Sequence, residues 1–232
     1  MKKLGLLGGM SWESTVVYYQ LINEGVNQRL GGLHSAEMIL YSVDFEVVEK
    51  LQSAGEWEEA GQLLACAAKG VEQAGAECVL ICTNTMHNVA GQVEASVEIP
   101  LLHIADATAE KLVENQIKTV GLLGTAFTME QDFYRQRMLE KYGIAVLVPQ
   151  KTDREIVHSI IYKELCKGKV LDSSRKEYLR IIQSLSDMGA EAVILGCTEI
   201  GLLVSQDDTG IPLFDTTRIH ADKAIDFALS ES

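Results

Sequence analysis

The chain has 232 residues, of which 47% are hydrophobic, and a formal net charge of −13 at pH 7. This hydrophobic content supports a substantial core, and the length fits one large domain or two small ones. The negative charge argues against a nucleic-acid-binding surface, because phosphate contacts need clustered Lys and Arg. The apolar runs fall short of the roughly 18 residues typical of a membrane span, so no membrane segment is expected.

The amino-terminal half alternates short apolar runs with helical patterns. The expected strands cover residues 3–7, 38–43, 78–82 and 99–102. The expected helices begin with one capped by Ser11 or Ser14 and continue at 47–55, 58–74 and 90–97. Gly8 and Gly9 form the turn after the first strand, where they allow a ligand to approach the backbone closely.

The carboxy-terminal half repeats this alternation. Its expected strands cover 119–123, 145–148, 192–195 and 211–214, and its expected helices 103–115, 127–142, 156–166, 175–188 and 219–229. Strands that alternate with helices predict an α/β fold with parallel sheets. Ligands of such sheets bind beyond the carboxyl ends of the strands, so the loops at these ends are the candidate binding loops.

Two stretches of the sequence occur twice, in the same order. GAECVLICTNT at 75–85 matches GAEAVILGCTE at 189–199, and KLGLLGG at 3–9 matches TVGLLGT at 119–125. The nearly equal offsets indicate a duplicated half of about a hundred residues. The match aligns Thr83 with Cys197. If the two halves face each other, the four loops that follow these repeated strands line one cleft.

Three motifs in this chain, LLGGMSWEST, CTNTMH and GCTEIGLL, resemble those of the aspartate/glutamate racemase family, which works without pyridoxal phosphate. The likeness spans essentially the whole chain and is greatest to enterobacterial aspartate/glutamate and broad-specificity amino-acid racemases. It implies two pseudo-symmetric domains, 1–102 with 215–232 and 103–214, each a short parallel sheet flanked by helices. It also implies an active site in the cleft between them.

The catalytic pair departs from the family pattern, because this chain has Thr83 where most members carry a first cysteine. A thiol has a pKa of about 8.5, so both of its protonation states can be reached near neutral pH. Backbone amides at the start of the next helix are expected to lower the pKa of Cys197 further. In the family the cysteine of the second half acts on the L isomer, so the resemblance implies that Cys197 removes the α-proton of L-aspartate or L-glutamate, with Thr83 as the opposite acid. L substrates are expected to react far better than D substrates.

The loops also predict a substrate-binding set. Its expected members are Met10, Gln52, Thr83, Asn84, Thr85, Thr125, Thr198 and Glu199. The hydroxyl and amide side chains suit the α-carboxylate and the amine of an amino acid. By resemblance, Met10 contributes its backbone and Gln52 faces the side-chain end of the substrate. Aspartate-selective relatives carry a cation in the Gln52 loop, so the neutral amide argues against strict selectivity for dicarboxylates.

Other residues are given structural roles. The core is expected to contain Cys66, Cys78 and Cys166. Cys82 is expected on the strand face opposite Thr83. His87 is expected to make a hydrogen bond, either within the site or in a structural role. Five cysteines without C-x-x-C spacing argue against disulfides and zinc, and reduced thiols fit a cytoplasmic location. No cofactor or metal is expected. The family resemblance implies a homodimer.

Two other functions stay open at this point. A single functional cysteine in this fold also suits an arylmalonate-type decarboxylase, which protonates its product from one face only. Carbon dioxide release from an arylmalonate would identify that activity. The remaining alternative is a catalytically impaired amino-acid-binding protein that has kept the fold and lost one base.

Overall fold

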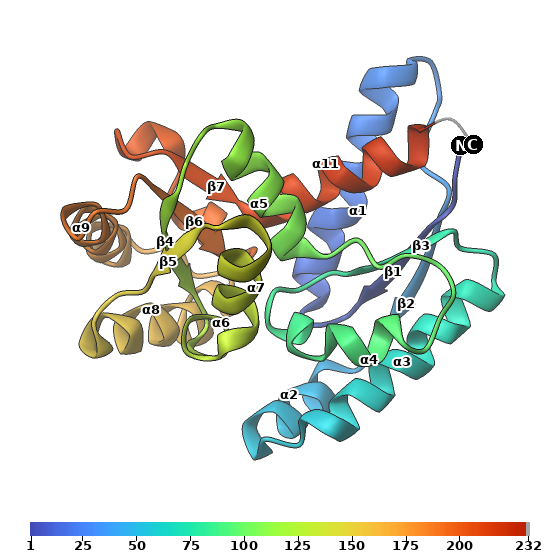
Figure 1. Cartoon of the computed structure of the whole chain (residues 1–232), viewed down its shortest axis with the longest axis horizontal. Helices are drawn as coiled ribbons and strands as arrows, with labels where there is room; N and C mark the ends of the chain where they lie inside the picture. Colours follow the sequence, from blue (N-terminus) through green and yellow to red (C-terminus); the bar gives the residue numbers. More distant parts are fainter. Residues whose placement is uncertain (231–232) are drawn as a thin grey trace. The chain divides into compact units, whose positions relative to one another are not determined.

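The computed structural model describes residues 1–230 and divides them into two compact units. The first unit contains residues 1–104 and those from His220 onward, and the second contains Ala105–Ile219. Figure 1 colours the chain along its sequence, so that blue and cyan elements belong to the first unit and lime to orange elements to the second. Each unit has its own parallel sheet with helices packed around it, which confirms the expected α/β fold.

The first unit is built on a three-stranded sheet in the order β2-β1-β3. The strands are β1 (Leu4–Gly8), β2 (Met38–Ser42) and β3 (Cys78–Ile81), and both pairings are parallel. The helices are α1 (Trp12–Leu30), α2 (Phe45–Ala54), α3 (Trp57–Gln73), the 3₁₀ helix η1 (Thr85–Val89) and α4 (Ala90–Glu94), with most of α11 (Thr216–Leu229).

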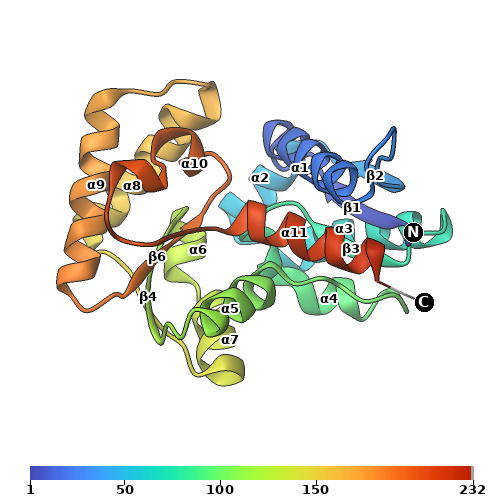
Figure 2. The same cartoon turned by 90° about the horizontal axis from the view of Figure 1, so that it is seen from above.

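The side chains of β1 alternate between two apolar clusters. Leu4 and Leu6 pack with residues of α1 and α11, whereas Leu7 packs with residues of α3 on the other face. Figure 2 shows α11 lying beside α1. Helices therefore cover both faces of this sheet, as a parallel sheet requires.

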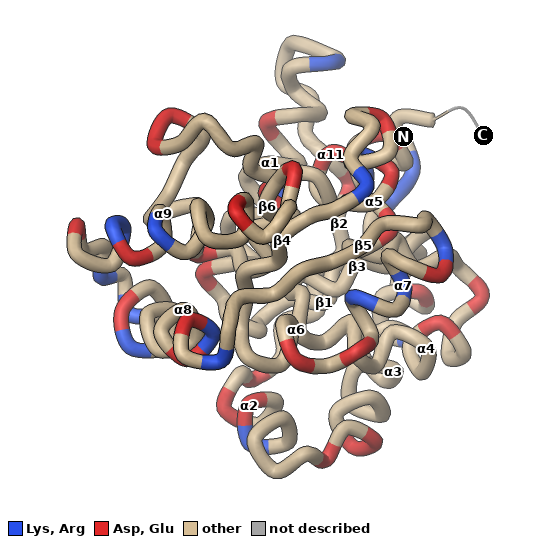
Figure 3. Tube along the Cα trace, turned by 60° about the vertical axis from the view of Figure 1, so that its left-hand side comes forward, with Lys and Arg blue, Asp and Glu red and all other residues tan. Residues whose placement is uncertain are grey.

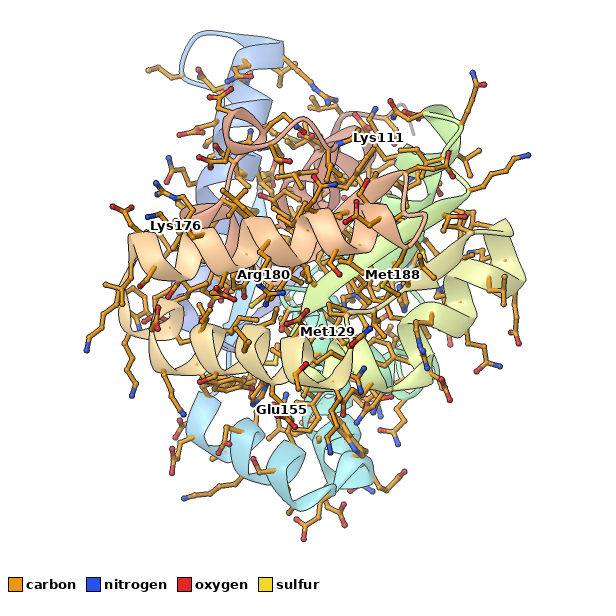
Figure 4. The ribbon with its side chains drawn as sticks, turned by 90° about the vertical axis from the view of Figure 1, so that its left-hand side faces the viewer. Lys111, Met129, Glu155, Lys176, Arg180 and Met188 are labelled. Carbon is orange, nitrogen blue, oxygen red and sulfur yellow. The ribbon has the colours of Figure 1, made fainter. Side chains whose placement is uncertain are left out.

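The second unit is built on a four-stranded parallel sheet in the order β5-β4-β6-β7. The strands are β4 (Thr119–Gly124), β5 (Ala145–Leu147), β6 (Ala192–Gly196) and β7 (Leu213–Asp215). The helices are α5 (Ile104–Glu114), α6 (Ala126–Glu130), α7 (Asp132–Tyr142), α8 (Lys151–Lys163), η2 (Leu165–Lys167), α9 (Asp172–Asp187), α10 (Ile200–Leu203) and η3 (Gln206–Asp208). Figure 4 shows α9 running alongside α8, where Arg180 binds the Asp153 carboxylate at 2.7 Å.

Glycines at matching positions of the two halves allow a helix to approach the central strand. A Cβ atom at Gly5 of β1 would lie 2.8 Å from Val71 of α3. A Cβ atom at Gly121 of β4 would likewise lie 2.8 Å from Leu185 of α9. The repeated glycine thus serves the same close packing in both units, which is a physical reason for the repeat.

Several expected elements differ in their bounds. Residues 99–102 form only one bridge, between Leu101 and Val79, instead of a strand. The helix expected at 127–142 is interrupted at Gln131, whose backbone is extended, so it divides into α6 and α7. The helix expected from residue 156 already begins at Lys151. The sequence misses this start because the first turn is polar and carries no apolar pattern.

The charged residues agree with the acidic composition. In Figure 3 the Lys and Arg residues lie interspersed with Asp and Glu along the chain. Among the described residues, none of the helices combines the length and the apolar character that crossing a bilayer demands.

Candidate active site

In the first unit, the turn after β1 is fixed by local hydrogen bonds. Gly9 has a φ of +90°, and its amide donates to Thr15 Oγ1 at 2.8 Å. Ser11, one of the two caps that the sequence allows, caps α1 by accepting from the Ser14 amide at 3.4 Å. Met10 lies between these groups and is buried. The backbone of Met10 is therefore held at the carboxyl end of β1.

The loop after β3 carries Thr83, Asn84 and Thr85. Thr83 is partly exposed, whereas the neighbouring Cys82 is fully buried in the cluster shared by α1 and α11. Burial raises the pKa of the Cys82 thiol, so that thiol stays protonated. The expected packing of Cys82 in the core is confirmed, and Cys82 cannot substitute for a thiolate at position 83.

Gln52 lies next to this loop. It is 4% exposed on α2, and its Nε2 donates to Met86 Sδ at 2.9 Å. Met86 follows Thr85 in η1. The first unit therefore brings Gln52 to the segment that contains the predicted residues 83–85, although they are far apart in the sequence.

In the second unit, a carboxylate gathers the polar groups that follow β6. Glu199 Oε2 accepts from Cys197 Sγ at 2.9 Å and from Thr198 Oγ1 at 2.7 Å. Its other oxygen, Oε1, lies 4.0 Å from Cys166 Sγ. Glu199 is 7% exposed, so these donors satisfy a carboxylate that is largely removed from solvent. The sequence gives no sign of the contact between Glu199 and Cys166.

The structure corrects the expected pKa of Cys197. Burial raises the pKa of this thiol well above its ordinary value, and the negative charge of Glu199 raises it further. A backbone hydrogen bond at Glu199 lowers the pKa, as the helix argument expects, but its effect is smaller. The helix α10 has only four residues, Ile200–Leu203. Cys197 in the resting protein is thus a neutral thiol that donates to Glu199.

Thr125 lies on the same sheet edge as Cys197. It follows β4, and Gly124 pairs with Gly196, the residue before Cys197. Thr125 Oγ1 caps α6 by accepting from the Thr128 amide at 3.3 Å. His158 Nδ1 accepts from the next amide, that of Ala126, at 3.1 Å. Burial lowers the pKa of His158, which agrees with a neutral ring that accepts this bond.

The remaining cysteines divide between core and surface. Cys78 is buried, as expected, and burial raises its pKa to about 12. Cys66 is exposed, so its expected place in the core is wrong. Cys166 is partly exposed beside Glu199 rather than in the core. The sequence around Cys166 reads as a helix end, and nothing in it signals a contact with a residue 33 positions away.

The chain is similar to known proteins over most of its length. Residues 7–224 match the family described as Asp/Glu/hydantoin racemase. A solved candidate Asp/Glu racemase from Yersinia pestis shares 56% identity, with 99% of this chain and all of that chain covered and a TM-score of 0.94. An aspartate racemase homologue from Pyrococcus horikoshii shares 36% identity, with 99% and 100% covered and a TM-score of 0.87.

A more distant curated relative is a broad-specificity amino-acid racemase from Bacillus subtilis. It is 19% identical over 234 residues, and the alignment covers 96% of both chains. The family match includes the loops that follow all four repeated strands, and the two solved relatives cover nearly the whole chain. The chain therefore belongs to the Asp/Glu/hydantoin racemase family.

Proposed function

We propose that this protein is an amino-acid racemase that acts on aspartate and glutamate without a cofactor. The observation that carries the proposal is the Cys197 thiol, which lies at the end of the central strand β6 and donates to Glu199 at 2.9 Å. A cysteine paired with an acceptor is the arrangement that an activated thiolate needs. The family membership supports the same chemistry.

Proton removal begins with the thiol. Glu199 takes the proton of Cys197, and the resulting thiolate removes the α-hydrogen of the L isomer. Cys197 is then a thiol again and Glu199 is a carboxylic acid. The substrate is a carbanion whose negative charge spreads onto the adjacent carboxylate. The raised pKa of Cys197 makes this thiolate strongly basic once it forms, because a higher pKa means a stronger base.

Proton return uses Thr83 on the opposite face of the carbanion. The hydroxyl donates its proton and yields the D isomer, and solvent then reprotonates the alkoxide while Glu199 releases its extra proton to solvent. The proton count is therefore balanced after each turnover. A threonine hydroxyl is a far weaker acid than a thiol, so the Thr83 step is the slower one, above all when Thr83 must act as the base.

Substrate binding draws on both sets of loops. The hydroxyl and amide groups of Asn84, Thr85, Thr125 and Thr198 suit the α-carboxylate and the amine. Gln52 is buried with its amide nitrogen on Met86, so it offers a neutral group to the side-chain end of a substrate. We expect aspartate and glutamate to be favoured without strict exclusion of neutral amino acids.

A panel of L- and D-amino acids, followed by circular dichroism without added cofactor, tests the proposed activity. We expect L-aspartate or L-glutamate to lose optical activity and no carbon dioxide to leave arylmalonate. Optical activity that persists for every amino acid would contradict the proposed racemase, and decarboxylation of arylmalonate would replace it with the alternative enzyme class.

The preference for L substrates should appear in isotope exchange. Because the two isomers have equal free energy, kcat/KM for complete racemisation must be the same in both directions. Cys197 alone can exchange the α-hydrogen of the L isomer, whereas exchange into the D isomer needs Thr83 as a base. In deuterated water we therefore expect label to enter recovered L-glutamate much faster than recovered D-glutamate, as measured by mass spectrometry of the separated isomers. Equal initial rates would contradict the assigned roles.

Removal of the Glu199 charge should lower both the pKa of Cys197 and the activity. In Glu199→Gln the thiol loses a negative neighbour and a proton acceptor, so its pKa falls, although burial still holds it above the ordinary value. The exchange rate of L-glutamate should fall on the order of a hundredfold or more, because a positioned general base contributes that much. Thiolate absorbance against pH and exchange kinetics measure the two effects.

Glu155→Gln is the matched control for this experiment. Glu155 is an exposed carboxylate on α8 of the same unit, labelled in Figure 4. Its loss changes the net charge equally and should leave both the titration and the exchange rate unchanged. A Glu199→Gln protein with the wild-type exchange rate would remove Glu199 from the mechanism.

A further inference from the structure

His87 connects the Thr83 loop to a segment that lies further along the chain. This residue is 2% exposed, with Nδ1 2.8 Å from the Thr83 carbonyl oxygen and Nε2 3.1 Å from the Ile104 amide nitrogen. An amide can only donate and a carbonyl can only accept, so Nε2 carries the lone pair and Nδ1 carries the proton. The bonds therefore define His87 as a neutral imidazole with one tautomer.

A second buried histidine fixes the same segment. His220 Nε2 lies 2.6 Å from the Leu102 carbonyl oxygen, and its Nδ1 lies 2.8 Å from Tyr18 Oη. The carbonyl requires a proton on Nε2, so the Tyr18 hydroxyl donates to Nδ1. Burial lowers the pKa of His220 to about 4, which keeps this ring neutral as well. The segment before α5 is thus held from two sides.

The rings of these residues are in contact. The centroids of His87 and His103 are 4.5 Å apart, and those of His87 and His220 are 5.8 Å apart. The His87 ring is therefore enclosed by other rings and tied at both nitrogens, which leaves it little freedom to move. Thr83 lies in a bend between β3 and η1, where its amide donates to the Ile81 carbonyl oxygen at 2.9 Å and its own carbonyl faces His87.

We propose that His87 is a positioning residue that sets the direction of the Thr83 hydroxyl by holding the Thr83 carbonyl. This rests on the proposed function, in which Thr83 protonates one face of the carbanion. The rigid ring holds the Thr83 carbonyl at a fixed place relative to Ile104, where α5 begins, and so fixes the backbone that carries the proposed acid. Loss of this tether should slow the Thr83 step and spare the Cys197 step, because the tether does not involve Cys197.

Three variants of His87 separate positioning from general stability. An asparagine amide nitrogen takes the place of Nδ1, so His87→Asn keeps the donor to Thr83 and loses the acceptor for Ile104. A glutamine amide oxygen reaches the place of Nε2, so His87→Gln keeps the acceptor and loses the donor. His87→Ala loses both. Each variant removes the same ring, so Asn and Gln are matched controls for each other.

The readout is a ratio: D-glutamate formed, divided by deuterium that enters recovered L-glutamate. We expect His87→Ala and His87→Gln to lower this ratio on the order of tenfold to a hundredfold, since misplacement by about 1 Å has effects of that size. We expect His87→Asn to restore most of it. Equal ratios in the Asn and Gln variants, or a wild-type ratio in His87→Ala, would overturn the proposal. Denaturation midpoints report any loss of stability, which would affect both steps alike.

A spectroscopic measurement tests His87 separately from catalysis. Nitrogen-15 NMR of the histidine rings should show His87 neutral with its proton on Nδ1, and His220 neutral with its proton on Nε2. A charged His87, or a proton on its Nε2, would overturn the tether even in an active enzyme. An inactive wild-type protein with the expected tautomer would instead contradict the proposed racemase and leave the tether in place.

Discussion

Replacing Cys197 with alanine is expected to abolish α-hydrogen exchange of L-glutamate, with a loss of roughly a thousandfold or more, because the proposed base for the L isomer is removed. Cys197→Ser should be almost as inactive, since a hydroxyl at the same place is a much weaker acid and yields far less of the basic form. Exchange kinetics in deuterated water measure both losses.

Binding must be measured beside activity in these two variants. Cys197→Ala should still be stabilised by L-glutamate in thermal unfolding, because the proposed carboxylate and amine contacts lie on other residues. Stabilisation follows the affinity for the folded state, so retained binding shows retained site geometry. Exchange that survives in Cys197→Ala would contradict the mechanism, and an inactive wild-type protein with intact binding would support an amino-acid-binding protein instead.

The other cysteines provide controls that the structure ranks. Cys66 is exposed on α3 and is not a member of the proposed site, so Cys66→Ala should leave exchange unchanged. Cys166 lies 4.0 Å from Glu199 and is a neighbour of the proposed proton acceptor. Cys166→Ala should lower the pKa of Cys197, since negative charge on Cys166 disfavours the neighbouring thiolate, without removing the base.

The sequence predicts most of the framework of the site. The two repeated strands and the residues that follow them, Thr83 and Cys197, could be found because spacing along one chain fixes where a buried strand ends. The same argument places Thr125, since β4 repeats β1. These predictions need only local pattern and the rule that parallel strands end at one edge.

Other features depend on contacts that no local pattern records. The carboxylate of Glu199 meets Cys166 across 33 residues, and His87 meets Ile104 across 17. The helix that follows Cys197 predicts a lowered pKa for its thiol, whereas burial and the Glu199 carboxylate raise that pKa. Gln131 interrupts a helix whose apolar spacing continues on both sides. Each of these outcomes depends on tertiary packing, which overrides local preference.

Thr83→Cys is expected to change the enzyme from a one-sided to a two-sided catalyst. A thiol at position 83 can reach its thiolate at a pH where a hydroxyl cannot, so deuterium should enter recovered D-glutamate on the order of a hundredfold faster than in the wild type. Exchange into L-glutamate should change little, because Cys197 and Glu199 are untouched. The ratio of the two exchange rates, measured on the separated isomers, should therefore move toward one.

Variants at Thr83 test whether its hydroxyl is the group that protonates the second face of the carbanion. Thr83 is partly exposed and its carbonyl is held by His87, so a thiol of similar size fits without repacking the core. Thr83→Ser keeps a hydroxyl and Thr83→Val removes it at the same volume, so the first should retain racemisation and the second should lose it while keeping exchange into the L isomer. If Thr83→Val still forms D-glutamate at the wild-type rate, another group protonates that face. The difference between exchange into the L and the D isomer would then come from a group other than the Thr83 hydroxyl.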